Sequence, residues 1–173
     1  SAATPRPGEL VISESMADPS GNDAGREWIE VFNTSARTLE LQDVVLQTSA
    51  QPHVIASSVS MVPGSYAVLG SSQDRAVNGN VTVDYAWGTS VALQNTGETL
   101  SLIRQDGMTI TSVASAGFDF VEGRAVQFDG RSDPSTSYNT DASFWCRAPE
   151  QWDIFQSSDF GTPVRANPDC DTP

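Results

Sequence analysis

The feature that most constrains this chain is its regular alternation of short apolar runs with turn residues. Runs of about four to eight residues, rich in β-branched and aromatic side chains, alternate with clusters of Gly, Pro, Asn, Asp and Ser. Helix signals are almost absent. The clearest turn clusters are PSGNDAG (19–25), PGS (63–65), NGN (78–80), NTGE (95–98) and QDG (105–107). This pattern predicts an all-β sandwich or barrel.

The same pattern places the individual strands. Longer strands are expected at residues 9–16, 27–33, 44–48, 65–69, 99–104 and 109–114. Shorter strands are expected at residues 38–41, 54–56, 81–84 and 125–128. The QDG segment lies between two strand-like runs, so it predicts a hairpin turn of the Asp-Gly type.

The length of 173 residues suits one domain with a sizeable core. We expect a flexible N-terminus at residues 1–8, which lacks a hydrophobic signal core and resembles a mature or trimmed start. Residues 9–173 then form one sandwich domain. Residues 129–173 are polar and turn-rich, so we expect an irregular C-terminal lobe that is anchored on the sandwich by Trp145, Trp152, Phe155 and Phe160. No apolar run approaches the roughly 18 residues of a membrane span, so no membrane insertion is expected.

The charge balance restricts the partners. There are 22 acidic and 9 basic residues, the basic ones all arginine, which gives a net charge of −13. Such a surface repels phosphate backbones, so no nucleic-acid binding is expected. The acidic excess fits either solubility, including adaptation to salty surroundings, or cation binding.

The only two cysteines are Cys146 and Cys170. Together with the single histidine, His53, they are too few for a Cys/His zinc site. We expect a disulfide in a secreted protein, which would stabilise the tail by roughly 3 kcal/mol through the loop it closes. The alternative is two free buried thiols in a cytosolic protein.

A series of motifs runs in fixed order from residue 8 to residue 171. The first motif, GELVISES…EWIEVFN, contains Glu14, Glu27, Trp28, Glu30 and Asn33. TLELQDVVLQ, VPGSYAVLG, NTGETLSLIRQDGMTITSVA and FGTPVRAN follow it. In this order the motifs resemble the bacterial branch of the lamin tail domain family.

Two departures from that family pattern are visible. Val44 stands where the family prefers Trp, and Val164 stands where it usually has Gly. The resemblance implies an Ig-like β-sandwich, and bacterial members of the family are typically exported. The chromatin contacts of eukaryotic members are not carried over, because this chain has no basic patch.

The acidic loop after the first expected strand is the best candidate site. Asp18, Asn22, Asp23 and Glu27 offer the oxygen ligands at flexible spacing that calcium prefers. The spacing is not that of an EF-hand. The alternative is an exposed turn in which Asp and Asn satisfy nearby backbone groups.

Three further sets of residues raise questions of chemistry. A second, weaker acidic cluster consists of Asp129, Asp133, Asn139 and Asp141. On strict alternation, Glu14 shares a face with Leu10, Ile12 and Met16, and Glu30 shares one with Trp28 and Phe32. A carboxylate on an apolar face needs a partner. We expect an ion pair with Arg26, Arg37 or Arg124; alternatively both glutamates face a metal or the C-terminal lobe.

No catalytic residues are assigned. The sequence has no G-x-S-x-G, no H-E-x-x-H and no phosphate-binding Gly loop, and His53 is expected to be an ordinary surface or turn histidine. We therefore expect a non-catalytic extracellular adhesion or scaffolding module that binds a protein or glycan at the cell surface and is stabilised by calcium. The alternatives are an accessory domain of a secreted hydrolase, of nuclease or phosphatase type, and a self-assembling structural protein.

Overall fold

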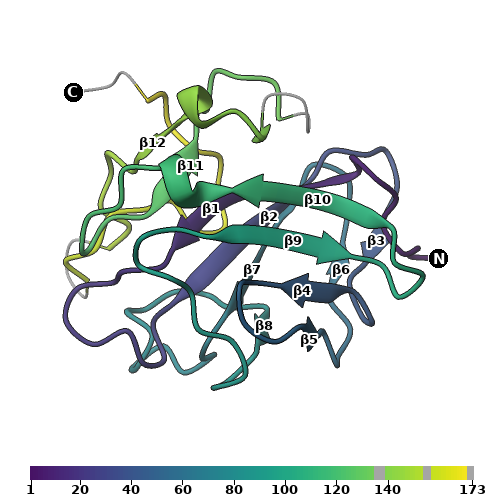
Figure 1. Cartoon of the computed structure of the whole chain (residues 1–173), viewed down its shortest axis with the longest axis horizontal. Helices are drawn as coiled ribbons and strands as arrows, with labels where there is room; N and C mark the ends of the chain where they lie inside the picture. The colour runs from purple at the N-terminus through teal and green to yellow at the C-terminus, as the bar shows by residue number, and fades with distance from the viewer. Residues whose placement is uncertain (135–138, 154–156, 171–173) are drawn as a thin grey trace.

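The apolar runs become twelve β-strands within residues 1–134, 139–153 and 157–170, the part of the chain that this computed structural model describes (Figure 1). The strands are β1 (Leu10–Met16), β2 (Trp28–Asn33), β3 (Leu39–Glu40), β4 (Val45–Gln47), β5 (His53–Val54), β6 (Ser60–Met61), β7 (Tyr66–Gly70), β8 (Tyr85–Ala86), β9 (Thr99–Ile103), β10 (Thr109–Ala114), β11 (Val126–Phe128) and β12 (Trp145–Arg147). Two short 3-10 helices, η1 (Ser115–Gly117) and η2 (Ala142–Phe144), accompany them.

The strands form two main layers. One is a six-stranded sheet in the order β12-β11-β1-β2-β7-β8, and the other is a four-stranded sheet in the order β10-β9-β4-β5. A small pair, β3-β6, lies beside them. Figure 1 shows β10, β9 and β4 in front of β1, β2 and β7. The expected all-β, Ig-like sandwich is therefore confirmed.

The main core fills the space between the two layers. Its largest fully buried side chains come from both sheets and from the segments that connect them. They include Leu10, Ile12, Ile29, Leu39, Leu41, Leu46, Ile55, Met61, Leu69 and Leu102. Burial of so many large aliphatic side chains, each worth about 1.5–3 kcal/mol, supplies the main driving force for this sandwich.

A β-bulge in β1 changes which side chains of the strand point to each face of the sheet. The pairing of β1 with β2 shifts register between Ile12 and Glu14. Ile12 therefore faces the main core, whereas Met16 belongs to a second apolar cluster on the opposite face of the sheet. The expectation that Glu14 shares a face with Ile12 by strict alternation is wrong, because the extra residue in the bulge reverses the pattern.

The C-terminal lobe covers this opposite face. The second cluster comprises Met16, Trp28, Val68, Val81, Val83, Ala125 and Ala148, and Trp152 and Phe160 of the lobe pack against it. The Trp152 ring meets the Trp28 ring edge-on, with 5.9 Å between centroids. Trp145 stacks on Phe118 at 4.6 Å. Phe155, the fourth expected anchor, lies outside the described residues.

The expected disulfide is present. Cys146 and Cys170 are bonded, their Cα atoms are 5.7 Å apart, and 24 positions separate them in the sequence. Cys146 lies in β12, which pairs with β11. The bond therefore ties the end of the lobe to the edge of the six-stranded sheet.

Nine of the ten expected strands overlap observed ones, and residues 81–84 do not. The strand in that region is β8, which begins at Tyr85. The Asp84 carboxylate accepts a hydrogen bond from the Val68 N–H at 2.8 Å, so a side chain takes the place of a backbone partner. The short strands β6 and β12 were not expected, because two- and three-residue strands leave too little alternation to detect.

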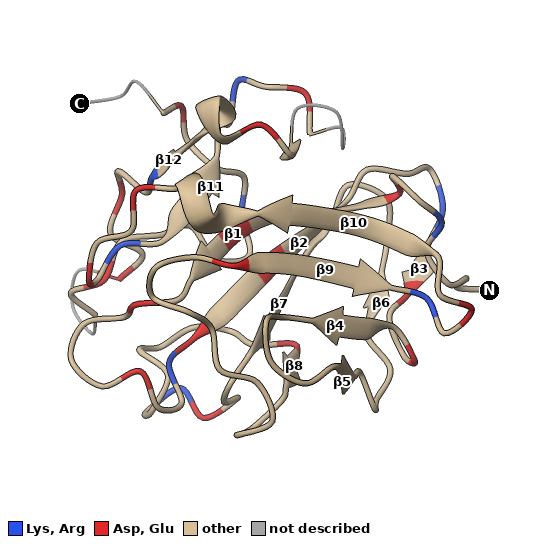
Figure 2. Cartoon of the chain, in the orientation of Figure 1, with Lys and Arg blue, Asp and Glu red and all other residues tan. Residues whose placement is uncertain are grey.

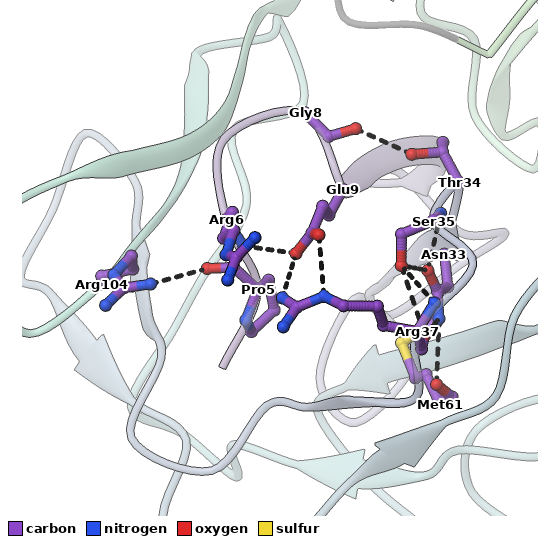
Figure 3. A network of polar contacts seen from close by, with 10 residues as sticks. All are labelled: Pro5, Arg6, Gly8, Glu9, Asn33, Thr34, Ser35, Arg37, Met61 and Arg104. Carbon is purple, nitrogen blue, oxygen red and sulfur yellow. Dashed lines mark hydrogen bonds and ion pairs between the residues drawn. The ribbon is translucent and has the colours of Figure 1, made fainter. Parts of the chain in front are cut away.

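A polar network holds the start of the chain (Figure 3). The Arg37 guanidinium donates to both Glu9 carboxylate oxygens, at 2.9 and 2.6 Å. The Thr34 hydroxyl donates to the Gly8 carbonyl at 2.7 Å, and the Ala3 N–H donates to the Thr38 carbonyl at 3.1 Å. The expected flexibility of residues 1–8 stays a prediction, since contacts do not measure motion.

Candidate functional site

The acidic loop lies at the end of the sandwich opposite the N-terminus, where the β1–β2 and β8–β9 connections meet (Figure 1). Asn95 joins the two connections: its side-chain amide donates to Asp18 Oδ1 at 3.0 Å and to Asp23 Oδ2 at 3.2 Å. Glu122 approaches from a third segment and accepts the Gly21 N–H at 2.9 Å. We call this set, Asp18, Asp23, Asn95 and Glu122, the acidic end.

The acidic end carries uncompensated charge. Burial raises the pKa of Asp18, and repulsion from Asp23 and Glu122 raises it further. Among the described residues, no arginine forms an ion pair with any of these three carboxylates. Figure 2 shows acidic residues in the loops of this end and also within β1 and β2. A cation would relieve the repulsion at the acidic end.

Glu27 sits directly before β2 and is only 7% exposed. One carboxylate oxygen, Oε1, accepts the Leu93 N–H at 3.2 Å. Burial raises the pKa of Glu27 to about 7; the Leu93 N–H opposes the rise, and Asp23 and Glu98 add to it. Glu27 also lines a pocket of about 340 Å³ together with Asp23. A perturbed carboxyl in a pocket is a frequent mark of a binding or reactive site.

Only two of the four predicted calcium ligands lie together. Asp18 and Asp23 meet at the Asn95 amide, whereas Glu27 turns toward Leu93. Asn22 accepts the Ala24 N–H at 3.0 Å, which is the turn-capping role given above as the alternative. In the described part of the chain, no three His, Cys, Asp or Glu side chains form a ready-made metal site.

Sequence reasoning missed the other partners at this end. Asn95 and Glu98 belong to the NTGE segment, which was interpreted only as a turn. Glu98 is buried and accepts the Ser49 N–H at 2.6 Å and the Gln94 N–H at 2.9 Å, so it holds the loop together. Nothing in the sequence pairs residue 95 with residues 18 and 23, because only the fold brings them together.

Residues of the second acidic cluster form hydrogen bonds that stabilise the C-terminal lobe. Asp129 accepts the Cys170 N–H at 3.1 Å, and buried Asn139 donates to the Ile12 carbonyl at 2.7 Å. Asp141 accepts the Ser143 N–H at 2.9 Å and caps η2. These three side chains therefore serve separate backbone groups.

The prediction that Glu14 and Glu30 form ion pairs with arginine is wrong. Each candidate arginine contacts a different residue. Arg26 forms an ion pair with Asp159 at 2.7 Å, and Arg37 forms one with Glu9. The Arg124 guanidinium stacks on the Phe160 ring. Both glutamates instead accept hydrogen bonds from the C-terminal lobe, as the alternative proposed. The bulge in β1 accounts for this, since it turns Glu14 toward the lobe.

His53 has a local partner. Its Nε2 lies 2.8 Å from the Tyr85 hydroxyl, and burial lowers the pKa of the imidazole. This contact joins β5 of the four-stranded sheet to β8 of the six-stranded sheet.

A comparison with protein-family models identifies the family of the chain. Residues 3–117 match the Lamin Tail Domain. This chain belongs to the lamin tail domain family. The match spans β1 to β10 and includes both connections of the acidic end, whereas β11, β12 and the lobe follow it. No curated protein and no solved structure gives a significant match to the chain.

The two departures from the family pattern have different consequences in this lamin tail domain. Val44 is fully buried in the main core, so it fills an apolar position with a smaller side chain. Val164 adopts a φ of 72°, a conformation that favours glycine. The residue is 44% exposed, so its side chain is not part of the buried core. Among the described residues, no helix has the length and apolar character to cross a membrane.

Proposed function

We propose that this lamin tail domain is a non-catalytic extracellular module that binds a protein or glycan at the cell surface, and that calcium stabilises its acidic end. The family supports the first part, because Ig-like sandwiches commonly present binding surfaces on the loops at their ends. The disulfide supports an oxidising location.

The observation that carries the proposal is the meeting of Asp18 and Asp23 on one amide. Asn95 holds the two carboxylates together, and both keep further oxygens for other ligands. Calcium takes six to eight oxygens at flexible geometry, from carboxylates, amide oxygens, backbone carbonyls and water. It would bind by turning the Asn95 amide and drawing the loop carboxylates inward, and would link the two connections more strongly than the amide does.

Thermal unfolding with added calcium tests this part of the proposal. We expect CaCl₂ to raise the Tm of the wild type and MgCl₂ to raise it less, since Mg²⁺ demands near-octahedral geometry. Asp23→Asn should remove the calcium effect. Asp74→Asn is the matched control, because it removes one exposed loop charge elsewhere and should leave the effect intact. Equal Tm values with calcium and with EDTA in the wild type would contradict the proposal.

Thiol labelling after cell fractionation tests the location. An extracellular protein should reach the medium or cell surface with Cys146 and Cys170 protected from alkylation until a reductant is added. Recovery in the cytosol with both thiols reactive would contradict an extracellular role.

A further inference from the structure

A pocket of about 340 Å³ opens beside Glu27, between the start of β2 and the connection that follows β8. Two carboxylates, two hydroxyls and an apolar side form its walls. These come from Asp23, Glu27, Ser71, Thr89, Val91 and Leu93. The pocket therefore combines negative charge with an apolar surface.

Glu27 lines this pocket, and one of its carboxylate oxygens has no hydrogen-bond partner among the described residues. The side chain is more than nine-tenths buried, and Oε1 is occupied by the Leu93 N–H. Within the described residues, Oε2 accepts no hydrogen bond, and neither Glu27 nor Asp23 has an arginine in ion-pair contact. A carboxylate removed from water is costly without a counter-charge, so the pocket is complementary to a cation.

The chemistry of the walls indicates which cation. A guanidinium binds best when both carboxylate oxygens are available, and Glu27 offers only one. A primary ammonium is a compact charge with three donors on a flexible apolar stem. Glu27 and Asp23 can accept from it, and Val91 and Leu93, each 5% exposed, line the side where the stem would pack.

We propose that this pocket receives a lysine side chain from a partner protein. The inference rests on the binding role proposed above and supplies the chemistry of the partner. The printed 173 residues contain no lysine, so copies of this segment cannot fill one another's pockets. The proposed partner surface carries an exposed lysine, and the net charge of −13 accelerates association where that surface is positively charged.

Titration with small probes tests the pocket directly. The backbone amide of Leu93 is followed by NMR in EDTA at pH 8 while Nα-acetyl-lysine methylamide is added. We expect a saturable shift. The norleucine analogue, which keeps the stem and lacks the charge, should give none. Glu27→Gln should weaken lysine binding by about tenfold or more, since it removes a charge-assisted hydrogen bond.

Two further variants complete the test. Asp23 is less buried than Glu27, so Asp23→Asn should not unfold the domain. This variant should also weaken lysine binding, and it tests the pocket if Glu27→Gln unfolds the domain. Asp74→Asn removes an exposed loop charge that neither lines the pocket nor belongs to the acidic end, and it should leave lysine affinity unchanged. Absence of saturation, equal shifts with norleucine, or tighter binding of the arginine analogue would overturn the inference. The proposed calcium effect is measured separately by Tm in the absence of probe, so either proposal can fail alone.

Discussion

Glu14 and Glu30 lie directly opposite each other on β1 and β2, and both side chains are fully buried. The Thr162 N–H donates to Glu14 at 2.9 and 3.1 Å, and the Val164 N–H donates to Glu30 at 2.6 Å. Neither acid has a basic hydrogen-bond partner in the described part of the chain, and together they hold the segment around Thr162 and Val164 against the sheet. Such a pair favours the protonated form, because burial and mutual repulsion both oppose ionisation.

The domain should lose stability as pH rises from about 4.5 toward 8. Burial raises the pKa of Glu30 from 4.5 to about 8, and burial together with repulsion from Glu30 raises the pKa of Glu14. The folded state therefore binds more protons than the unfolded state in this window, and the free energy of unfolding falls as pH increases. Denaturant unfolding at half-unit steps of pH measures the slope.

Removing the Glu30 carboxylate tests whether this residue causes the pH dependence of the free energy of unfolding. Glu30→Gln keeps the hydrogen-bond acceptor for Val164 and cannot ionise, so the slope should become shallower. Glu14 and Glu27, whose pKa values are also raised by burial, account for the slope that remains in this variant. Asp74→Asn, on an exposed side chain away from the buried pair, should keep the wild-type slope. Stability that increases from pH 5 to pH 8 in the wild type would refute the assignment.

Loss of the disulfide should destabilise the lobe without abolishing the sandwich. The double variant Cys146→Ser, Cys170→Ser removes a cross-link over 24 positions, which is worth roughly 3 kcal/mol in the chain-entropy model. For a domain of this size, that corresponds to a fall in Tm of about 6–12 °C. Reduction of the wild type should reproduce the fall, and reductant should not affect the double variant.

The sequence predicted the parts of this molecule that depend on local pattern. The positions of β1, β2, β9 and β10, the hairpin between β9 and β10 at residues 105–107 and the Cys146–Cys170 bond all follow from residue type and spacing. The Asp-Gly turn type was predicted incorrectly, because Arg104 pairs with Met108 around three residues and only Gly107 has a positive φ. Glu14 marks the limit of that approach. The register shift before it is a backbone event that no residue type announces, so its face and its partners were predicted incorrectly.

The candidate site was only partly predictable for a related reason. Asp18, Asp23 and Glu27 stand out because they are acidic and close in sequence. Their partners Asn95 and Leu93 lie some seventy positions away and contribute an amide and a backbone N–H, which have no distinctive pattern. The free oxygen of Glu27 follows from that long-range contact and is invisible in the sequence.

Val164→Gly should stabilise the domain. Val164 has a φ of 72°, and a strained non-glycine residue of this kind costs about 1–3 kcal/mol. Glycine removes the strain, but the greater conformational entropy of the unfolded chain costs roughly 0.5–1 kcal/mol, so the net gain should be about 2.5 kcal/mol at most. Val164→Ala keeps a Cβ at the same φ and should gain less. A lower free energy of unfolding for Val164→Gly than for the wild type would contradict this account.

Lysine binding at the Glu27 pocket should strengthen with pH. Burial raises the pKa of Glu27 to about 7, with Asp23 and Glu98 adding to the rise, whereas the lysine ammonium stays charged up to about pH 10. Only the ionised carboxylate attracts the ammonium, and its fraction falls from about 0.9 at pH 8 to about 0.1 at pH 6. The apparent Kd of Nα-acetyl-lysine methylamide should therefore increase about tenfold between these values, as measured on the Leu93 amide. Asp23→Asn should move the midpoint to lower pH, because it removes a neighbouring negative charge. A Kd that is constant from pH 6 to pH 8 would mean that the ammonium does not bind at Glu27.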